Sequence, residues 1–230
     1  MTSFKEKTRQ IVNNEQAFLK LEKYVELIEE KNKHMNLTGF SGDKLWEEGI
    51  FESIVFLQNQ FQKEGLINKN IELLDVGAGA GFPSVPYAII NENVNLTIYE
   101  PMQKRVDFLN IVKAELNLKM NAFKIRAEES KEKEKFDFVC ARAVMDLRKL
   151  IEVTHFLAKK GSVFSFLKGP KVFEEQKEAS WIMSELKIDP KIEKINTQND
   201  KDNYSFSFSK TDKTPEVFPR KWEKILKNIH

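Results

Sequence analysis

The residues of this chain best suited to binding chemistry lie in one stretch, 71–83. It begins as a short apolar run, which predicts a buried parallel strand. Asp75 lies near the end of this run, and Gly77, Gly79 and Gly81 follow at alternate positions. Glycine can adopt a positive φ and has no Cβ, so the backbone can turn sharply against a ligand. The residues after this stretch predict a helix, whose free N–H groups would face the same spot. A strand, a glycine turn and a helix N-terminus together predict a nucleotide-type pocket.

The glycine spacing separates two classes of nucleotide-binding protein. A dinucleotide-binding loop has the pattern G-x-G-x-x-G. Here an acid precedes G-x-G-x-G, which resembles the loop of Rossmann-like S-adenosylmethionine (SAM) methyltransferases. The next predicted strand, 94–99, is closed by Glu100, about 20 residues beyond the glycines, where a carboxylate can accept hydrogen bonds from two ribose hydroxyls. We therefore expect Asp75, Gly79, Gly81 and Glu100 to help bind a SAM cofactor.

The composition limits the other functions that the chain could have. Its 230 residues, 41% of them hydrophobic, are enough for one well-buried α/β domain with an appendage. Cys140 is the single cysteine, which excludes an internal disulfide, and the three histidines lack metal-ligand spacing, so we expect no metal. No signal peptide and no long apolar run is present, so we expect a cytoplasmic protein that does not enter a membrane. The net charge of +2 is too small to indicate a nucleic-acid partner by itself.

Strands and helices alternate from position 71 onward, which predicts a doubly covered, mostly parallel sheet. The predicted strands are 71–76, 94–99, 121–126, 136–141 and 162–167, with a final pair at 192–196 and 204–209; the predicted helices are 4–34, 43–61, 84–91, 102–117, 145–159 and 171–187. Asp43 is the expected cap of the second helix, and Gly161 is expected to end the helix over 145–159.

The last of these strands and the ends of the chain complete the expected architecture. Phe206 and Phe208 alternate with serines, which predicts an antiparallel edge strand. An antiparallel last strand is typical of the class I methyltransferase fold with seven strands. We expect an N-terminal helical extension (1–66) packed on a SAM-binding core (67–210), with a basic tail (211–230).

Six blocks of the sequence, in order, resemble the bacterial small-subunit (16S) rRNA guanine-N7 methyltransferases, also called glucose-inhibited division protein B. The blocks are Met35-Asn36-Leu37-Thr38, Leu74 to Pro83, Arg126-Ala127-Glu128-Glu129, Ala141-Arg142-Ala143-Val144, Leu167-Lys168-Gly169-Pro170 and Phe218-Pro219-Arg220-Lys221. They span the chain from about residue 30 to residue 221. In one place the chain departs from this family, because Gly49 replaces its usual histidine.

The resemblance implies how SAM would be held. It implies cofactor contacts at Gly77, Phe82, Ala127, Glu128 and Arg142. The glycine would let the loop approach the methionine part of the cofactor, and the phenylalanine would wall the pocket. Ala127 and Glu128 follow the third strand, where adenine is held by backbone groups and a side-chain acceptor. Arg142 ends the fourth strand, at the rim where ligands bind in open sheets.

The resemblance also implies the reaction, methylation of guanine N7. Because N7 carries a free lone pair, its attack on the methyl group needs no general base. The catalytic work is positioning, for which we expect Arg142, Lys168 and Asn36. The two cations are assigned to the cofactor carboxylate, guanine O6 or RNA phosphate. Arg220 and Lys221 are expected to bind RNA phosphates, and the expected partner is small-subunit rRNA, within the ribosomal particle or its precursor, bound by a monomer.

Three other functions fit parts of the sequence. A SAM enzyme with another substrate is possible, but the stretch 141–144 lacks the Asn/Asp-Pro-Pro-Tyr/Phe motif of many amino methyltransferases. A nicotinamide oxidoreductase is disfavoured by the glycine spacing. A non-catalytic RNA-binding or ribosome-assembly protein with a relict SAM fold is disfavoured by the intact glycines, Glu100 and Glu128, and absence of SAM binding would identify it.

Overall fold

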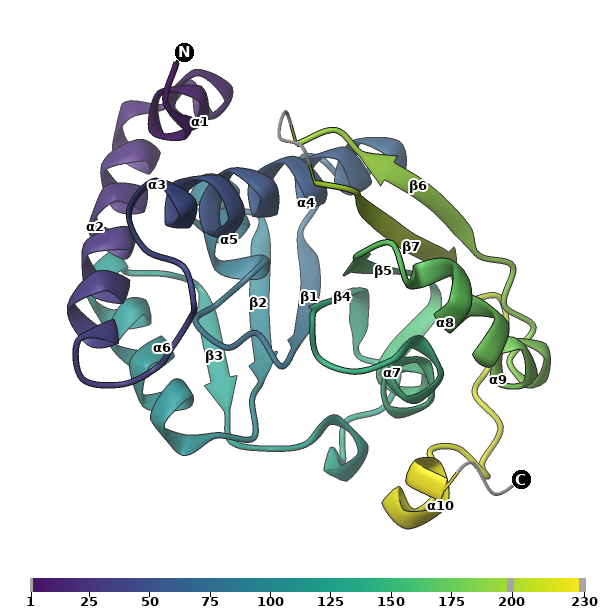
Figure 1. Cartoon of the computed structure of the whole chain (residues 1–230). Helices are drawn as coiled ribbons and strands as arrows, with labels where there is room; N and C mark the ends of the chain where they lie inside the picture. The colour runs from purple at the N-terminus through teal and green to yellow at the C-terminus, as the bar shows by residue number, and fades with distance from the viewer. Residues whose placement is uncertain (1, 198–200, 228–230) are drawn as a thin grey trace.

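The computed structural model describes residues 2–197 and 201–227, and within them one seven-stranded sheet is the centre of the fold (Figure 1). The strand order is β3-β2-β1-β4-β5-β7-β6. The strands are β1 (Ile71–Val76), β2 (Val94–Tyr99), β3 (Met120–Phe123), β4 (Phe136–Arg142), β5 (Ala158–Lys168), β6 (Lys191–Ile195) and β7 (Asn203–Ser209). Strands β1 to β5 are parallel, whereas β7 is antiparallel to β5 and to β6. The predicted mostly parallel sheet with an antiparallel last strand is confirmed.

The position of the last strand in the sheet differs from the prediction. Strand β7 lies between β5 and β6, so β6 forms the edge. Phe206 and Phe208 are buried as expected, but Ser205 and Ser207, which alternate with them, are buried as well. Alternating serines are typical of a strand with one solvent-exposed face, whereas both faces of β7 are covered. Serine is small and its hydroxyl finds partners inside, as Ser205 Oγ does with the carbonyl of Glu193 at 3.4 Å.

The helices surround this sheet; the predicted ranges 84–91 and 102–117 each match one helix, whereas the predicted helices 43–61 and 171–187 are each divided. The helices are α1 (Phe4–Val12), α2 (Glu15–Asn32), α3 (Gly42–Lys44), α4 (Glu52–Lys63), α5 (Ser84–Ile90), α6 (Gln103–Leu116), α7 (Leu147–Thr154), α8 (Val172–Glu178), α9 (Ser180–Glu185) and α10 (Trp222–Lys227), with a π-helix η1 (Leu45–Phe51) and 3-10 turns η2 (Ala127–Glu129) and η3 (His155–Leu157). The predicted single helix 4–34 is two helices. Asn13 adopts a left-handed conformation at φ 45°, and the side chain of Asn14 then caps α2.

Other boundaries were wrong for local reasons. Ser41, not Asp43, precedes the first turn of α3, and no side-chain cap bond forms there. The predicted helix 145–159 ends at Thr154, and Gly161 lies inside β5 at φ 84°. The register of β5 against β4 shifts at this point, so Gly161 lies in a β-bulge and does not end a helix.

The two faces of the sheet carry two hydrophobic layers. Along β4, Phe138 and Cys140 belong to one layer, whereas Val139 and Ala141 belong to the other, as the alternation of a strand requires. Helices α2, α4, α5 and α6 supply the first layer, and α7, α9 and the tail supply the second. In Figure 1, α1 and α2 lie at the β3 end of the sheet, α4 runs across the sheet toward β6, and α8 to α10 lie toward the other end.

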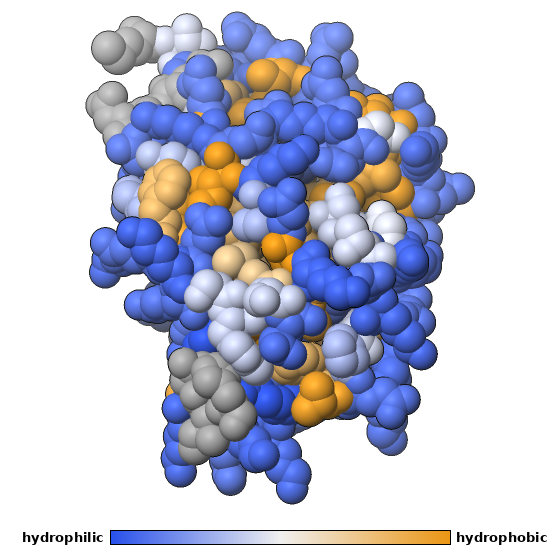
Figure 2. All heavy atoms as spheres, turned by 90° about the vertical axis from the view of Figure 1, so that its right-hand side faces the viewer, coloured by the Kyte–Doolittle hydropathy of each residue, from blue (hydrophilic) through white to orange (hydrophobic). Residues whose placement is uncertain are grey.

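The outer surface is largely polar at the β6 end of the sheet. Figure 2 shows that face, on which hydrophilic side chains surround small hydrophobic groups. No helix in the described ranges has the length and apolar character that crossing a membrane requires.

Candidate functional site

The loop after β1 has the backbone conformation that its glycines predict. Gly77, Gly79 and Gly81 have φ values of 71°, 60° and 114°, all in the region that favours glycine. The N–H of Gly77 donates to the carbonyl of Tyr99 at 2.8 Å, which joins the loop to the end of β2. A Cβ on Gly77 would lie 2.9 Å from Val144, and one on Gly81 would lie 2.6 Å from the hydroxyl of Tyr24. Both positions therefore require glycine for space as well as for φ.

Tyr24 contacts the glycine loop, a role that the sequence does not predict. It lies on α2, and its buried hydroxyl donates to the carbonyl of Ala80 at 2.7 Å. Its ring also packs edge-on against Phe82, with the ring centroids 6.0 Å apart. The N-terminal helices therefore hold the glycine loop directly. Tyr24 looks like one more apolar position of an amphipathic helix, so no sequence signal separates it from its neighbours.

Asp75 lies under the loop rather than on its open side. The residue is fully buried, and its Oδ2 accepts the N–H of Ser84 at 3.2 Å. Burial raises the pKa of Asp75 to about 7. The carboxyl group thus holds the first residue of α5 against the end of β1, and it shapes the pocket from below.

Glu100 connects the glycine loop to the segment after β2. Its Oε2 accepts the N–H of Gly79 at 3.1 Å, and its Oε1 accepts the N–H of Met102 at 3.0 Å. Arg105 Nη1 lies 3.7 Å from Oε1. A carboxylate has about four acceptor positions, so one remains on each oxygen after these two backbone bonds. Glu100 is 1% exposed here, and the ribose-binding role expected from the sequence stays a prediction.

The turn η2 forms the next part of the same sheet edge. Ala127 is buried, whereas the side chain of Glu128 is 11% exposed, and burial raises its pKa. Arg126 lies 3.9 Å from Glu128, and its guanidinium lies 5.6 Å from the ring centroid of Trp222. A cavity of about 440 Å³ separates this turn from the C-terminal tail. The tail therefore borders the place where the adenine of SAM is expected.

Arg142 lies at the end of β4 and is held by the N-terminal helices. Its Nη1 donates to the carbonyl of Glu48 at 2.6 Å, and its Nη2 lies 2.8 Å from Glu52 Oε1. The guanidinium also lies 5.3 Å from the ring centroid of Phe40. Burial lowers the pKa of Arg142 and raises that of Glu52. The second carboxylate oxygen of Glu52 accepts from the amide of Asn203 on β7.

Lys168 ends β5 and points its ammonium group into a fixed set of acceptors. Its Nζ donates to the carbonyl of Met145 at 2.6 Å and to Glu175 Oε2 at 2.7 Å. The same oxygen of Glu175 accepts the N–H of Leu147 at 2.9 Å. Between Lys168 and Arg142 lies a cavity of about 410 Å³; it is lined by Glu52, Arg142, Ala143, Val144, Met145, Leu167, Lys168, Gly169, Glu175 and Asn203. The structure thus brings the two predicted cations to one cavity.

Asn36 lies on the loop between α2 and α3, where it is exposed. Asn32 organises this loop, because its amide donates to the carbonyl of Thr38 at 3.0 Å and accepts the N–H of Leu37 at 3.0 Å. Farther along the loop, Phe40 packs against Phe82 with the ring centroids 6.2 Å apart. The end of the loop thus reaches the glycine loop, but Asn36 itself lines a separate hollow with Thr38 and Phe40 and is not among the described residues of the cavity between Arg142 and Lys168.

Gly49 has no room for the histidine that the family resemblance would place there. A Cβ on Gly49 would lie 2.8 Å from Leu45 and 2.9 Å from the ring of Phe82. Gly49 lies within the π-helix η1, between the two glutamates that contact Arg142. In this chain Phe82 fills the space beside the helix.

The two tail residues predicted to bind RNA have different surroundings. Arg220 Nε and Nη2 donate to both carboxylate oxygens of Glu152, at 2.7 and 2.8 Å, and its side chain is only 7% exposed. Its guanidinium also lies 4.6 Å from the ring centroid of Trp181. This residue docks the tail on α7. Lys221 is exposed and available to a phosphate.

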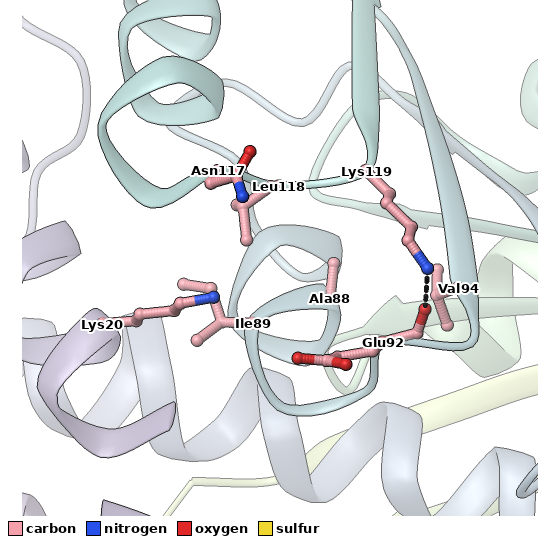
Figure 3. Close-up of a pocket in the computed structure, with 8 residues that line it drawn as sticks. All are labelled: Lys20, Ala88, Ile89, Glu92, Val94, Asn117, Leu118 and Lys119. Atoms are coloured by element: carbon pink, nitrogen blue, oxygen red, sulfur yellow. Dashed lines mark hydrogen bonds between the residues drawn. The ribbon is translucent and has the colours of Figure 1, made fainter. Parts of the chain in front are cut away.

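A further cavity lies away from these residues. Figure 3 shows it between α2, α5 and the segment before β3, with Lys20, Glu92 and Lys119 around it and a volume of about 220 Å³. Val94, the first residue of β2, lines it. The cavity is therefore at the amino ends of the strands, whereas the glycine loop lies at their carboxyl ends, where ligands bind in open α/β sheets.

Comparison with known proteins agrees with this geometry. The family model for rRNA small subunit methyltransferase G (GidB) matches residues 17–202. The chain is 42% identical over 212 residues to "Ribosomal RNA small subunit methyltransferase G" of Mycoplasmopsis pulmonis, covering 90% of this chain and 91% of that one. It is 44% identical over 193 residues to the protein of the same name from Mycoplasma mobile, covering 83% and 84%.

A solved structure supports the fold independently. A SAM-dependent methyltransferase from Aquifex aeolicus superposes with a TM-score of 0.53 at 19% identity, over 68% of this chain and 91% of that one. At this identity the likeness shows the Rossmann-like methyltransferase fold alone. The family match and the identity to its members show more: the chain belongs to the rRNA small subunit methyltransferase G family of SAM-dependent enzymes.

Proposed function

We propose that this enzyme transfers a methyl group from SAM to N7 of one guanine in small-subunit rRNA. The observation that carries the proposal is the division of the carboxyl edge of the sheet into two adjoining parts. The glycine loop, Glu100 and η2 form a cofactor part along β1, β2 and β3. The cavity between Arg142 and Lys168 forms a substrate part along β4 and β5.

Each chemical group of SAM has a matching set of residues in the cofactor part. Gly77 and Gly81 let the loop stay close to the sheet, and Phe82 closes its end. Glu100 offers an acceptor position on each oxygen to the ribose. Ala127 and Glu128 would face the adenine, with the half-buried carboxylate accepting from its amino group. When bound, SAM supplies a methyl group on a positively charged sulfur, which makes that carbon electrophilic.

The substrate part suits a nucleophile that needs no deprotonation. Among the described residues that line the cavity, none is a histidine, and the carboxylates of Glu52 and Glu175 are ion-paired with Arg142 and Lys168. The two acidic and two basic side chains that line the cavity have no net formal charge together. Guanine N7 becomes cationic when methylated, so an uncompensated cation beside the ring would oppose the reaction. The paired charges remove this obstacle and can hold the base in place.

The rRNA would have to present this guanine out of its stack, as an unpaired base in a loop. Lys221 on the exposed side of the tail would contact phosphate, which gives salt-dependent binding. With a net charge of only +2, we expect weak binding to naked RNA and better recognition of the folded small-subunit particle or its precursor, by an enzyme that acts as a monomer. Such a substrate would place its action in the cytoplasm.

Transfer of labelled methyl from SAM tests this proposal. The acceptors are small subunits and protein-free rRNA from cells that lack the protein, and the product is digested to nucleosides. We expect label in 7-methylguanosine at one site, with intact subunits as the better acceptor. Label in another nucleoside would contradict the specificity, and neither label nor SAM binding would contradict the enzymatic function.

A further inference from the structure

One carboxylate in the substrate cavity is fixed in position and still has an unused oxygen. Glu175 Oε2 accepts from the N–H of Leu147 and from Lys168 Nζ, which saturates that oxygen. In the part of the chain that the structure describes, Oε1 has no hydrogen-bond partner, and the side chain is 23% exposed. Glu175 lines the cavity together with Arg142 and Asn203. The cavity therefore presents a preorganised acceptor to whatever enters it.

The other charged groups of the cavity are less available. The residue Glu52 is 1% exposed, and its carboxylate is used by Arg142 and Asn203. Lys168 is 7% exposed at its side chain, with its ammonium held by Glu175 and by the carbonyl of Met145. Of the two acids, Glu175 is thus the one that a base could reach without rearrangement.

An N7 methyltransferase cannot distinguish purines by the atom it methylates, because adenine and guanine both carry N7. They differ at position 6, beside N7, and along the Watson–Crick edge. Guanine has donors at N1 and N2 and an acceptor at O6, whereas adenine has an acceptor at N1 and a donor at N6. A carboxylate accepts from the guanine donors, but it meets a lone pair at N1 of adenine. Buried polar groups left unpaired in this way give strong discrimination.

Building on the proposed function, we propose that Glu175 Oε1 accepts hydrogen bonds from N1–H and N2–H of the target guanine. Lys168 acts as a positioning residue, because it holds Oε2 and so orients the carboxylate. The same contact assists the reaction. A negative group that accepts from the N1 and N2 donors raises the electron density of the purine. As N7 forms its bond to the methyl carbon and the sulfur leaves with the electron pair, the base becomes positive, and the carboxylate offsets this charge.

The substitution Glu175→Gln tests this assignment, because Leu147 N–H and Lys168 Nζ would hold the amide oxygen and turn the NH2 group, a donor, toward the donors of guanine. The matched control is Glu174→Gln, which removes the same charge from an exposed neighbour on α8. Each protein is assayed by methyl transfer from labelled SAM to small subunits that carry either the mapped target guanine or an adenine in its place. Equilibrium SAM binding is measured alongside.

We expect Glu175→Gln to lower kcat/KM for the guanine substrate by about 10- to 100-fold, as for a lost hydrogen bond to a charged group. The guanine-to-adenine ratio should fall by at least the same factor, whereas SAM affinity and the control variant stay at the wild-type level. A structural role alone would lower both substrates equally and leave the ratio unchanged. That result, or an unchanged guanine rate, would overturn the assignment.

The assay of the wild-type protein shows whether a negative result concerns Glu175 alone or the proposed function as well. If the wild type labels 7-methylguanosine and only the ratio test fails, the proposed function stands and Glu175 does not recognise the base. If the wild type labels another nucleoside, the proposed function and this inference both fail.

Discussion

Replacing Gly81 with alanine should distort the glycine loop through two effects that can be separated. Gly81 has φ 114°, a conformation that costs an L-residue about 1–3 kcal/mol. The new Cβ would also lie 2.6 Å from the hydroxyl of Tyr24 and 2.7 Å from Val85 Cγ2. Both neighbours are buried, so relief requires movement of packed groups, at about 1–3 kcal/mol. We expect Gly81→Ala to reduce the free energy of unfolding by about 2–6 kcal/mol in total.

Gly161→Ala is the matched control for backbone strain. Gly161 has φ 84°, and no atom lies within 4 Å of a Cβ built there. This variant should therefore lose only the conformational part. Thermal unfolding of the two variants should differ by roughly 2–4 °C for each kcal/mol of steric conflict in a chain of this size. Isothermal titration should show weakened SAM binding for Gly81→Ala alone.

Two results would refute this reasoning. Equal destabilisation of the Gly81 and Gly161 variants would show that the contact between Tyr24 and the loop is not tight. Unchanged SAM affinity in a measurably destabilised Gly81→Ala protein would show that the shape of this loop does not determine cofactor binding.

Three other predictions concern charges. Arg220→Ala should destabilise the protein by about 3–5 kcal/mol in chemical denaturation, because it removes the ion-pair partner of the buried Glu152. Lys221→Ala should leave stability unchanged but weaken binding to small subunits and reduce the salt dependence of that binding. A reversed pattern would contradict the two assignments. Burial raises the pKa of Asp75 from its ordinary value of 3.8 to about 7 in the folded state, so the folded protein keeps a proton that the unfolded chain has lost. Its contribution to stability should therefore be fully present below about pH 4 and fall as pH rises toward 7, by up to about 1.4 kcal/mol per pH unit; unfolding of Asp75→Asn followed across this range should lack that slope, and an identical slope would exclude Asp75 as its source. Arg142→Lys keeps the charge but not the fork that joins Glu48 and Glu52, so it should lose at least about 10-fold in methyl transfer; wild-type activity would show that the charge alone is sufficient.

The geometry of the glycine loop and its neighbours was predictable because its signals are local. The glycine loop, the strand before it and the helix after it are adjacent in sequence, and each residue type has a conformational reason to be there. Glu100 follows the next strand by the same logic. In a parallel sheet the ends of successive strands meet at one edge, so the order of elements along the chain is enough to bring these residues together.

The cavity between Arg142 and Lys168 was predictable only in part, because its contacts join distant segments. Arg142 and Lys168 were placed at strand ends, but their partners come from α4 and α8, and the spacing of Glu52 and Glu175 in the sequence gives no sign of these pairs. Tyr24 was hidden among apolar positions of α2 for the same reason. Arg220 looked like a surface cation within a basic tail, and only the structure shows that its guanidinium meets Glu152 in the interior.

Two of the wrong predictions share a physical cause. Asn13 and Gly161 both adopt positive φ, which a periodic pattern of apolar residues does not reveal. The first divides a predicted helix, and the second allows a bulge in a strand. The misplaced edge strand had a different cause, since small serines can be buried when their hydroxyl groups find partners.

Mapping of the methylated position in cellular rRNA tests the central claim most directly. Small-subunit rRNA from cells with and without this gene would be digested, analysed by mass spectrometry, and cleaved chemically at N7-methylated guanines. We expect one guanine that carries the N7 methyl group in the wild type, lacks it in the deletion strain, and regains it with the wild-type gene but not with Arg142→Ala. Identical methylation in the wild-type and deletion strains, or a lost methyl group at another atom or base, would exclude transfer by this enzyme to guanine N7.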